Sequence, residues 1–240
     1  MKIIQDTQRN CARMAAEEYR KLLGENPHCV LGLATGSTPE MLYEELVALC
    51  KAGKLSFKDV TTYNLDEYVG LDGSHPQSYR YFMDSHLFNL VDIDKTRTHV
   101  PCGIGVTDEM AAHYDDEIKQ AGGVDLQLLG IGHDGHIGFN EPHDAFDLGT
   151  HCVDLAQETI EANKRFFDGN VDLVPKQAYT MGIRTIMQAR KVLMVVNGAG
   201  KAEIVKKAFF GPVTPEVPAS ILQLHPDFIL VGDEEALSLI

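Results

Sequence analysis

Thirteen consecutive residues near the middle of the chain, GIGHDGHIGFNEP at 130–142, carry most of the side chains that could do chemistry. Glycines alternate there with two histidines, an aspartate and a glutamate, and the apolar run VDLQLL leads into them. The residues alone leave four interpretations open: a dinucleotide-binding loop, a metal site, an acid–base catalytic loop, or a sharp turn with solvated side chains.

The dinucleotide interpretation starts from GIGHDG at 130–135, which satisfies the pattern G-x-G-x-x-G after an expected strand. Asp154 also lies about twenty residues further on, as that pattern requires. The context does not fit, because Gly138 and Pro142 prevent a long helix from starting directly after the pattern. The pattern also follows a middle strand of the chain rather than the first strand, so we expect no dinucleotide here.

A metal site would use His133, His136, Glu141 and His143. The H-x-x-H spacing binds a metal on a helix, but the glycines disfavour a helix here, and no H-E-x-x-H motif is present. We therefore expect no metal and no cofactor.

The acid–base interpretation uses Asp134, His136 and Glu141, which can converge if the glycines let the loop fold back on itself. Two flanking carboxylates would fix the tautomer of the histidine and favour its cationic form. Such a histidine suits the transfer of a proton to a sugar oxygen.

A second candidate is the stretch YNLDEYVGL at 63–71, which places Asp66 and Glu67 where a strand is expected to end. Neighbouring side chains on an extended chain point to opposite sides, so one carboxylate can face a cleft while the other serves the structure. The functional interpretation is a general base with a raised pKa, and the alternative is a solvated acidic turn.

The stretch LATGSTPE at 33–40 leaves one expected strand and enters a helix. Gly36 permits a tight turn, Thr38 is expected to cap the helix, and Pro39 suits its first turn. Free N–H groups and the hydroxyls of Thr35, Ser37 and Thr38 could then bind an anion such as a phosphate, or the segment could be a capped turn only.

The strands and helices around these motifs determine where the motif residues lie. The hydrophobic pattern predicts short apolar strands that alternate with amphipathic helices. This alternation predicts one α/β domain, residues 1–240, with a mostly parallel, doubly wound, Rossmann-like sheet and helices on both faces. Ligands in such folds bind at the carboxyl ends of the strands. The expected strands are 28–34, 59–65, 124–132, 177–183, 191–198 and 228–233, and the expected helices are 5–24, 39–53, 76–88, 107–122, 156–167 and 200–210.

Composition excludes several classes of partner. A net charge of −14 without a basic cluster argues against nucleic acid, and no apolar run is long enough to cross a membrane. Five scattered cysteines, an odd number, argue against a disulfide framework and for a reducing compartment. The first residues do not resemble a signal peptide, so we expect a cytoplasmic location.

The three stretches LATGSTPE, NLDEYVGL and GIGHDGHIGFNEP, in this order, resemble the glucosamine-6-phosphate deaminases. The similarity runs from the first expected helix to about residue 235. The related 6-phosphogluconolactonases are similar in the DGH element but differ in the GFNEP that follows.

The resemblance implies roles for individual residues in converting glucosamine 6-phosphate to fructose 6-phosphate and ammonia. Asp66 matches the general base that moves a proton from C2 to C1, and His136 matches the group that opens the sugar ring. Asp134 and Glu141 match the carboxylates that orient and charge that histidine.

The phosphate site that the resemblance implies includes Thr35, Gly36 and Ser37, with Arg165 and Lys201 as its two cations. These cations explain how an acidic protein could hold an anionic sugar phosphate. Because Arg165 lies downstream of the loop, we expect a lid at about 143–175 that closes on the phosphate.

The chain departs from the longer, allosterically activated members of the family. His151 and Val153 stand where those members carry an arginine and a lysine. We therefore expect no activation by N-acetylglucosamine 6-phosphate and a monomeric protein. Two rival functions remain: a 6-phosphogluconolactonase-like hydrolase, and a sugar-phosphate sensor without catalysis. The sensor is disfavoured because nothing before Met14 leaves room for a DNA-binding segment.

Overall fold

The computed structural model describes residues 1–105 and 107–240. Among these residues, seven parallel strands form one sheet. In spatial order they are β1 (Lys2–Asp6), β10 (Phe228–Asp233), β9 (Lys191–Val196), β6 (Leu126–Leu129), β2 (Val30–Leu33), β3 (Thr61–Asn64) and β5 (Thr98–His99). Every residue of β2, β6 and β10 is buried, as expected for strands covered on both faces.

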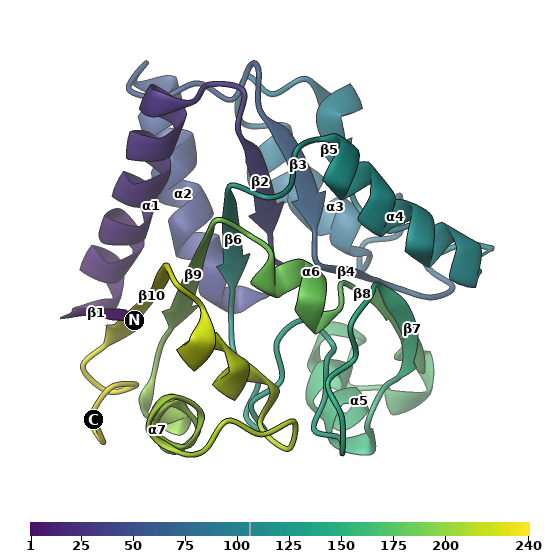
Figure 1. Cartoon of the computed structure of the whole chain (residues 1–240). Coiled ribbons are helices and arrows are strands. Elements are labelled where there is room, and N and C mark those ends of the chain that lie inside the picture. The colour runs from purple at the N-terminus through teal and green to yellow at the C-terminus, as the bar shows by residue number, and fades with distance from the viewer. Residues whose placement is uncertain (106) are drawn as a thin grey trace.

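Helices cover both faces of this sheet (Figure 1). The helices α1 (Gln8–Glu25) and α2 (Ser37–Lys51) pack side by side, and both contact β9. The connections through α4 (Asp108–Gln120) and α7 (Ala202–Phe210) run in the opposite direction along the sheet, so right-handed crossovers place these two helices on the other face. No helix in the described part of the chain is both long and apolar enough to cross a bilayer.

The strand order reverses between β2 and β6. After β2 the chain builds outward to β3 and β5, and after β6 it builds outward to β9 and β10 on the other side. The segments 33–40 and 130–142 leave these two adjacent strands at their carboxyl ends. Ligands of doubly wound folds bind at such a reversal, so the fold itself places the two motif loops where a binding site is expected.

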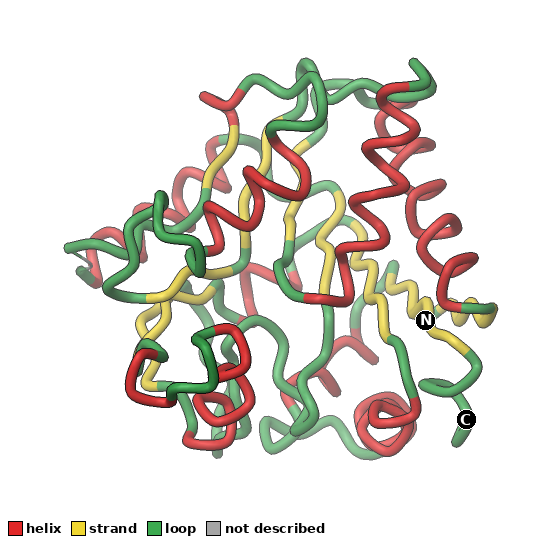
Figure 2. Tube along the Cα trace, turned by 180° about the vertical axis from the view of Figure 1, so that it is seen from behind, coloured by secondary structure: helices red, strands yellow, loops and turns green. Residues whose placement is uncertain are grey.

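A second, antiparallel sheet lies to one side of the first (Figure 2). It consists of β4 (Asp66–Tyr68), β8 (Gln177–Thr180) and β7 (His151–Asp154), in this order. A separate hydrophobic cluster supports it, formed by Tyr68, Phe139, Leu155, Ile160, Phe167, Val174 and Ala178.

One residue, Leu65, joins the two sheets. Its N–H donates to the carbonyl of Leu33 on β2 at 3.0 Å, and its carbonyl accepts from Met181 N, directly after β8, at 2.7 Å. The expected strand 59–65 is therefore the end of one strand and the approach to another, and Asp66 belongs to the small sheet.

The predicted fold class is confirmed, and the differences lie in short elements. The expected strand 177–183 is antiparallel and lies in the small sheet rather than the large one. The expected helix 5–24 starts at Gln8, because residues 2–6 pair with β10 as an edge strand. The short strands β5 and β7 were not predicted, because too few residues carry their pattern.

Three further helix predictions were wrong at their ends. The helix α2 begins at Ser37, with Gly36 in the capping position, so Thr38 lies inside the helix and does not cap it. The helix expected from residue 76 begins at Tyr79, where the Ser78 hydroxyl caps the short helix α3 (Tyr79–Met83), and a π-helical turn (Asp84–Phe88) follows. The helix expected over 156–167 comprises α5 (Gln157–Asn163) and one 3₁₀ turn.

Candidate active site

Asp66 meets the glycine-rich loop at Gly138. Asp66 pairs with Thr180 across the small sheet, and the Thr180 hydroxyl accepts the N–H of Phe139 at 2.9 Å. Gly138 has a φ of +60°, and a Cβ there would lie 2.7 Å from Thr180 Oγ1 and 3.6 Å from Asp66 Oδ2. Glycine is therefore required at this point, and its absent side chain lets the loop pass directly over the carboxyl of Asp66.

The carboxyl of Asp66 is only 6% exposed. Burial, together with the negative charge of Glu67, raises the pKa of Asp66 to about 8. No side-chain or backbone group in the described part of the chain donates a hydrogen bond to it. A buried carboxyl with a pKa near the working pH is well suited to take a proton and give it back.

His136 forms an ion pair with Asp134 in the same loop. The distance from His136 Nδ1 to Asp134 Oδ1 is 2.7 Å, and the same oxygen accepts the backbone N–H of His136 at 3.1 Å. Burial opposes the ionisation of Asp134, but the contacts with His136 outweigh it and lower the pKa of Asp134 to about 2. Asp134 thus stays a carboxylate beside the imidazole and fixes its position in the loop.

The imidazole of His136 lies against Gly132. A Cβ at Gly132 would stand only 2.2, 2.3 and 2.5 Å from three ring atoms, and Gly132 N donates to the carbonyl of His136 at 2.9 Å. Two of the four glycines of the loop, Gly132 and Gly138, therefore make room for the two candidate catalytic side chains.

Glu141 does not join Asp134 at the histidine, in contrast to the predicted convergence. Its carboxylate accepts the N–H of Ala156 at 2.8 Å and the hydroxyl of Thr159. The reason is the turn at 137–140, which Asn140 locks by donating to the carbonyls of Ile137 at 2.8 Å and Met181 at 2.9 Å. This turn carries Glu141 to the start of α5, which it holds to the loop.

Lys201 reaches back to the same loop from the turn after β9. Its Nζ donates to the carbonyl of Ile131 at 2.7 Å. Burial lowers the pKa of Lys201, the carboxylate of Asp134 raises it, and the positive charge of Arg165 lowers it further. The positive charge of Lys201 in turn is the first cause of the lowered pKa of His133. Lys201 and Arg165 are thus close enough at the loop to interact electrostatically.

The segment Thr35–Gly36–Ser37 faces open space at the neighbouring strand end. Gly36 has a φ of +109°, and no atom lies within 4 Å of the position that its Cβ would take. The first turn of α2 follows directly, so its free N–H groups point toward the reversal of strand order. Arg165 is exposed, and its guanidinium lies 4.6 Å from the centre of the Phe166 ring.

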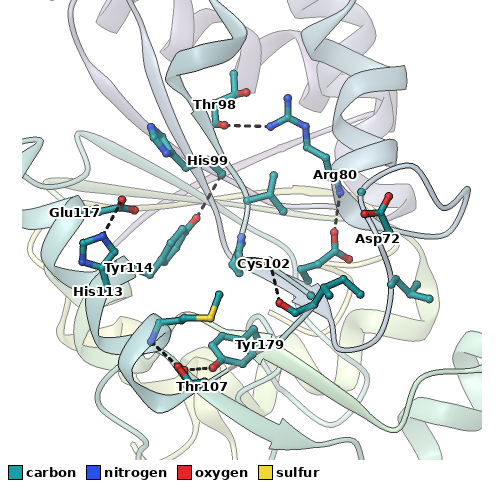
Figure 3. A pocket seen from close by; sticks show the side chains of 18 of the residues that line it. Asp72, Arg80, Thr98, His99, Cys102, Thr107, His113, Tyr114, Glu117 and Tyr179 are labelled. Carbon is teal, nitrogen blue, oxygen red and sulfur yellow. Dashed lines mark hydrogen bonds and ion pairs between the residues drawn. The ribbon is translucent and has the colours of Figure 1, made fainter.

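A cavity lies away from these residues, behind β4. It measures about 770 Å³ and includes neither Asp66 nor His136. Figure 3 shows the side chains around it. The guanidinium of Arg80 donates a hydrogen bond to the carbonyl of Thr98, and the hydroxyl of Tyr179 donates one to the carbonyl of Thr107. Glu67 lines this cavity, whereas Asp66 faces the loop at Gly138, so the two faces of β4 border different parts of the protein. The contacts at Gly138, rather than this cavity, locate the candidate active site.

Thr180 is a site residue that the sequence did not reveal, because its pairing with Asp66 joins residues 114 positions apart. The sequence left open whether Asp66 or Glu67 faces the cleft. Because side chains alternate along β4, Asp66 faces the loop and Glu67 points to the opposite side of the strand. In the described part of the chain, no group of three or more histidine, cysteine, aspartate or glutamate side chains is arranged to hold a metal ion.

Comparison with known proteins follows this geometry. Residues 4–230 match the family described as glucosamine-6-phosphate isomerases/6-phosphogluconolactonase. Glucosamine-6-phosphate deaminase of Clostridium perfringens strain 13 is 51% identical over 230 residues, which is 95% of each chain. A solved structure described as a monomeric glucosamine-6-phosphate deaminase is 41% identical and superimposes with a TM-score of 0.95 over 100% of both chains.

The structure of 6-phosphogluconolactonase from Trypanosoma cruzi has a TM-score of 0.76 at 18% identity, covering 99% of this chain and 96% of that one, and shares the fold alone. The family match covers nearly the whole chain, and the Clostridium perfringens relative is identical at about half of the aligned residues. The chain belongs to the family of glucosamine-6-phosphate isomerases and 6-phosphogluconolactonases.

Proposed function

We propose that this protein converts glucosamine 6-phosphate and water to fructose 6-phosphate and ammonia. The observation that carries the proposal is the meeting of the buried Asp66 carboxyl with the His136 loop at Gly138. Relatives about 50% identical that bear the deaminase name support the same substrate.

The chemistry requires the ring to open first, because the C2 proton is not acidic while C1 is a hemiacetal. In our proposal His136, held beside Asp134, passes a proton to the ring oxygen and the aldehyde forms at C1. Asp66 then takes the C2 proton and returns it at C1, which leaves an imine at C2. Water adds to the imine and ammonia leaves. Each positioned proton transfer typically contributes about 10²- to 10⁴-fold in rate, or roughly 3 to 5 kcal/mol.

The phosphate of the substrate would bind between the turn Thr35–Ser37 and the cations Lys201 and Arg165. The mutual influence of the two cations and the open turn at Gly36 support this assignment. Binding energy from this remote group would position C2 over Asp66. Because Glu141 holds α5 to the loop, and Arg165 follows α5, residues 143–175 are suited to act as a lid that responds to the phosphate.

We also infer a monomer in a cytoplasmic setting. The first inference is supported by the relative described as monomeric, and the second by the odd number of scattered cysteines.

The decisive experiment offers the protein glucosamine 6-phosphate and 6-phosphogluconolactone in parallel. We expect ammonia and fructose 6-phosphate from the first and no hydrolysis of the second. Lactone hydrolysis without ammonia release would instead assign the rival function of the shared fold, and binding without turnover of either would assign a sensor.

The role of Asp66 has its own test. In heavy water, the wild-type protein should exchange the C2 proton of the substrate with solvent. Asp66→Asn should abolish this exchange and retain binding of the sugar phosphate. Unchanged exchange in the variant would remove Asp66 from the mechanism.

A further inference from the structure

Glu67 stands directly beside Asp66 on β4 but faces the other way. Its side chain is 2% exposed and lies at the wall of the cavity behind the strand. Gly103 closes over it, since a Cβ there would stand 3.3 Å from Glu67 Cγ and 2.3 Å from the carbonyl of Tyr68. The mechanism described above does not use this buried acid, so its presence needs a reason.

Three backbone N–H groups bind the carboxylate of Glu67. Tyr68 N and Tyr79 N each donate to Oε1 at 2.9 Å, and Arg80 N donates to Oε2 at 3.0 Å. Two of these donors belong to the first residues of α3, so Glu67 fastens β4 to that helix. A carboxylate with several N–H donors is stabilised in its ionised form.

No side-chain cation neutralises Glu67 in the part of the chain that the structure describes. The nearest candidate, Arg80, turns its guanidinium to the carbonyl of Thr98 at 3.1 Å and to Asp84 at 3.3 Å. Burial raises the pKa of Glu67, and the three N–H donors oppose that rise. Asp66 has no such donors, so the negative charge of the pair resides on Glu67 and the proton on Asp66.

The other titratable groups around Asp66 are tyrosines contributed by each packed element. Burial raises the pKa of every one of them above its usual range, so they remain neutral where carboxylates titrate. They are Tyr43 on α2, Tyr68 on β4, Tyr79 on α3 and Tyr114 on α4. Glu67 is therefore the charged group that acts on Asp66.

We propose that Glu67 is a positioning residue for Asp66: its buried carboxylate ties β4 to α3, which fixes where Asp66 stands, and its fixed negative charge makes Asp66 hold its proton more strongly. The catalytic consequence rests on the proposed function, but the electrostatic coupling does not. A stronger hold on the proton makes Asp66 a stronger base once it is ionised, which favours removal of a weakly acidic C2 proton.

Two substitutions separate charge from geometry. Glu67→Gln removes the charge and keeps the size, so the acid limb of the pH profile of kcat/KM should move to lower pH by about one unit. Glu67→Asp keeps the charge but shortens the reach to α3, so it should lower Tm and kcat and leave the limb in place. Glu117→Gln, at another wall of the same cavity, is the matched control and should not move the limb.

A titration without substrate tests the coupling independently of turnover. Carboxyl ¹³C NMR, with Asp66→Asn to assign the signal, should show Asp66 titrating about one unit lower in Glu67→Gln than in the wild type. In the wild-type protein Glu67 should titrate below Asp66, a comparison that does not depend on Glu67→Gln folding. Equal Asp66 midpoints in both proteins, or Glu67 titrating above Asp66, would overturn the proposal even if the enzyme proved to act on a different sugar phosphate.

Discussion

The contact between Gly132 and the His136 ring makes Gly132→Ala a sharp test of the ring-opening role. A Cβ at this position would stand 2.2 to 2.5 Å from three imidazole atoms, whereas ordinary contacts begin at 3.4 Å. Gly132 does not have a positive φ, so alanine fits the backbone and the ring must move away by about an ångström. A displacement of about 1 Å typically costs about 100-fold in rate.

We therefore expect kcat for ammonia release from glucosamine 6-phosphate to fall about 100-fold, equivalent to roughly 2.7 kcal/mol. KM should change little, because the residues proposed to bind the phosphate are untouched. Gly130→Ala is the matched control, since no atom lies within 4 Å of the added methyl group. Both variants should melt near the wild-type temperature. If Gly132→Ala retains at least a third of the turnover of Gly130→Ala, the placement of His136 is not what limits the reaction.

Three further predictions follow from the site. Asp66→Asn should not change Tm near pH 4 but should raise it at pH 8 in thermal melts. The pKa of Asp66 is raised from 3.8 to about 8, so the wild-type protein loses stability progressively between these two pH values and the variant does not; a Tm difference independent of pH would contradict this. His136→Gln should slow turnover of the cyclic substrate more than that of an open-chain analogue, and equal losses in steady-state rates would remove its ring-opening role. Added N-acetylglucosamine 6-phosphate should not increase the initial rate, since His151 and Val153 replace the expected cations; a saturable increase would show an effector site.

The sequence predicted the part of the fold that periodicity controls. The buried strands β2, β6, β9 and β10 and the long helices are dense in apolar residues, so local pattern and tertiary packing agree. The edge strand β1 and the short strands β5 and β7 exist because a neighbour pairs with them, and no local pattern reveals such a neighbour.

The candidate site was predictable in composition but not in contacts. The Asp134–His136 pair was predictable because the two residues are only two positions apart, and a glycine-containing loop can bring such close neighbours into contact. The partners of Glu141 lie 15 and 18 positions further on, and the turn locked by Asn140 decides that direction. Side-chain hydrogen bonds of this kind depend on the completed packing, which the order of residues does not display.

The N–H of Leu65 bonds to the large sheet and its carbonyl to the small one, so only one residue can lie between Asn64 and Asp66. Side chains alternate along an extended chain, so inserting or deleting a single residue here would turn the Asp66 carboxyl away from the Gly138 loop and bring Glu67 to that side. The same change would break the hydrogen bonds by which Glu67 ties β4 to α3. One residue more or less at this point would thus be enough to dismantle the candidate site.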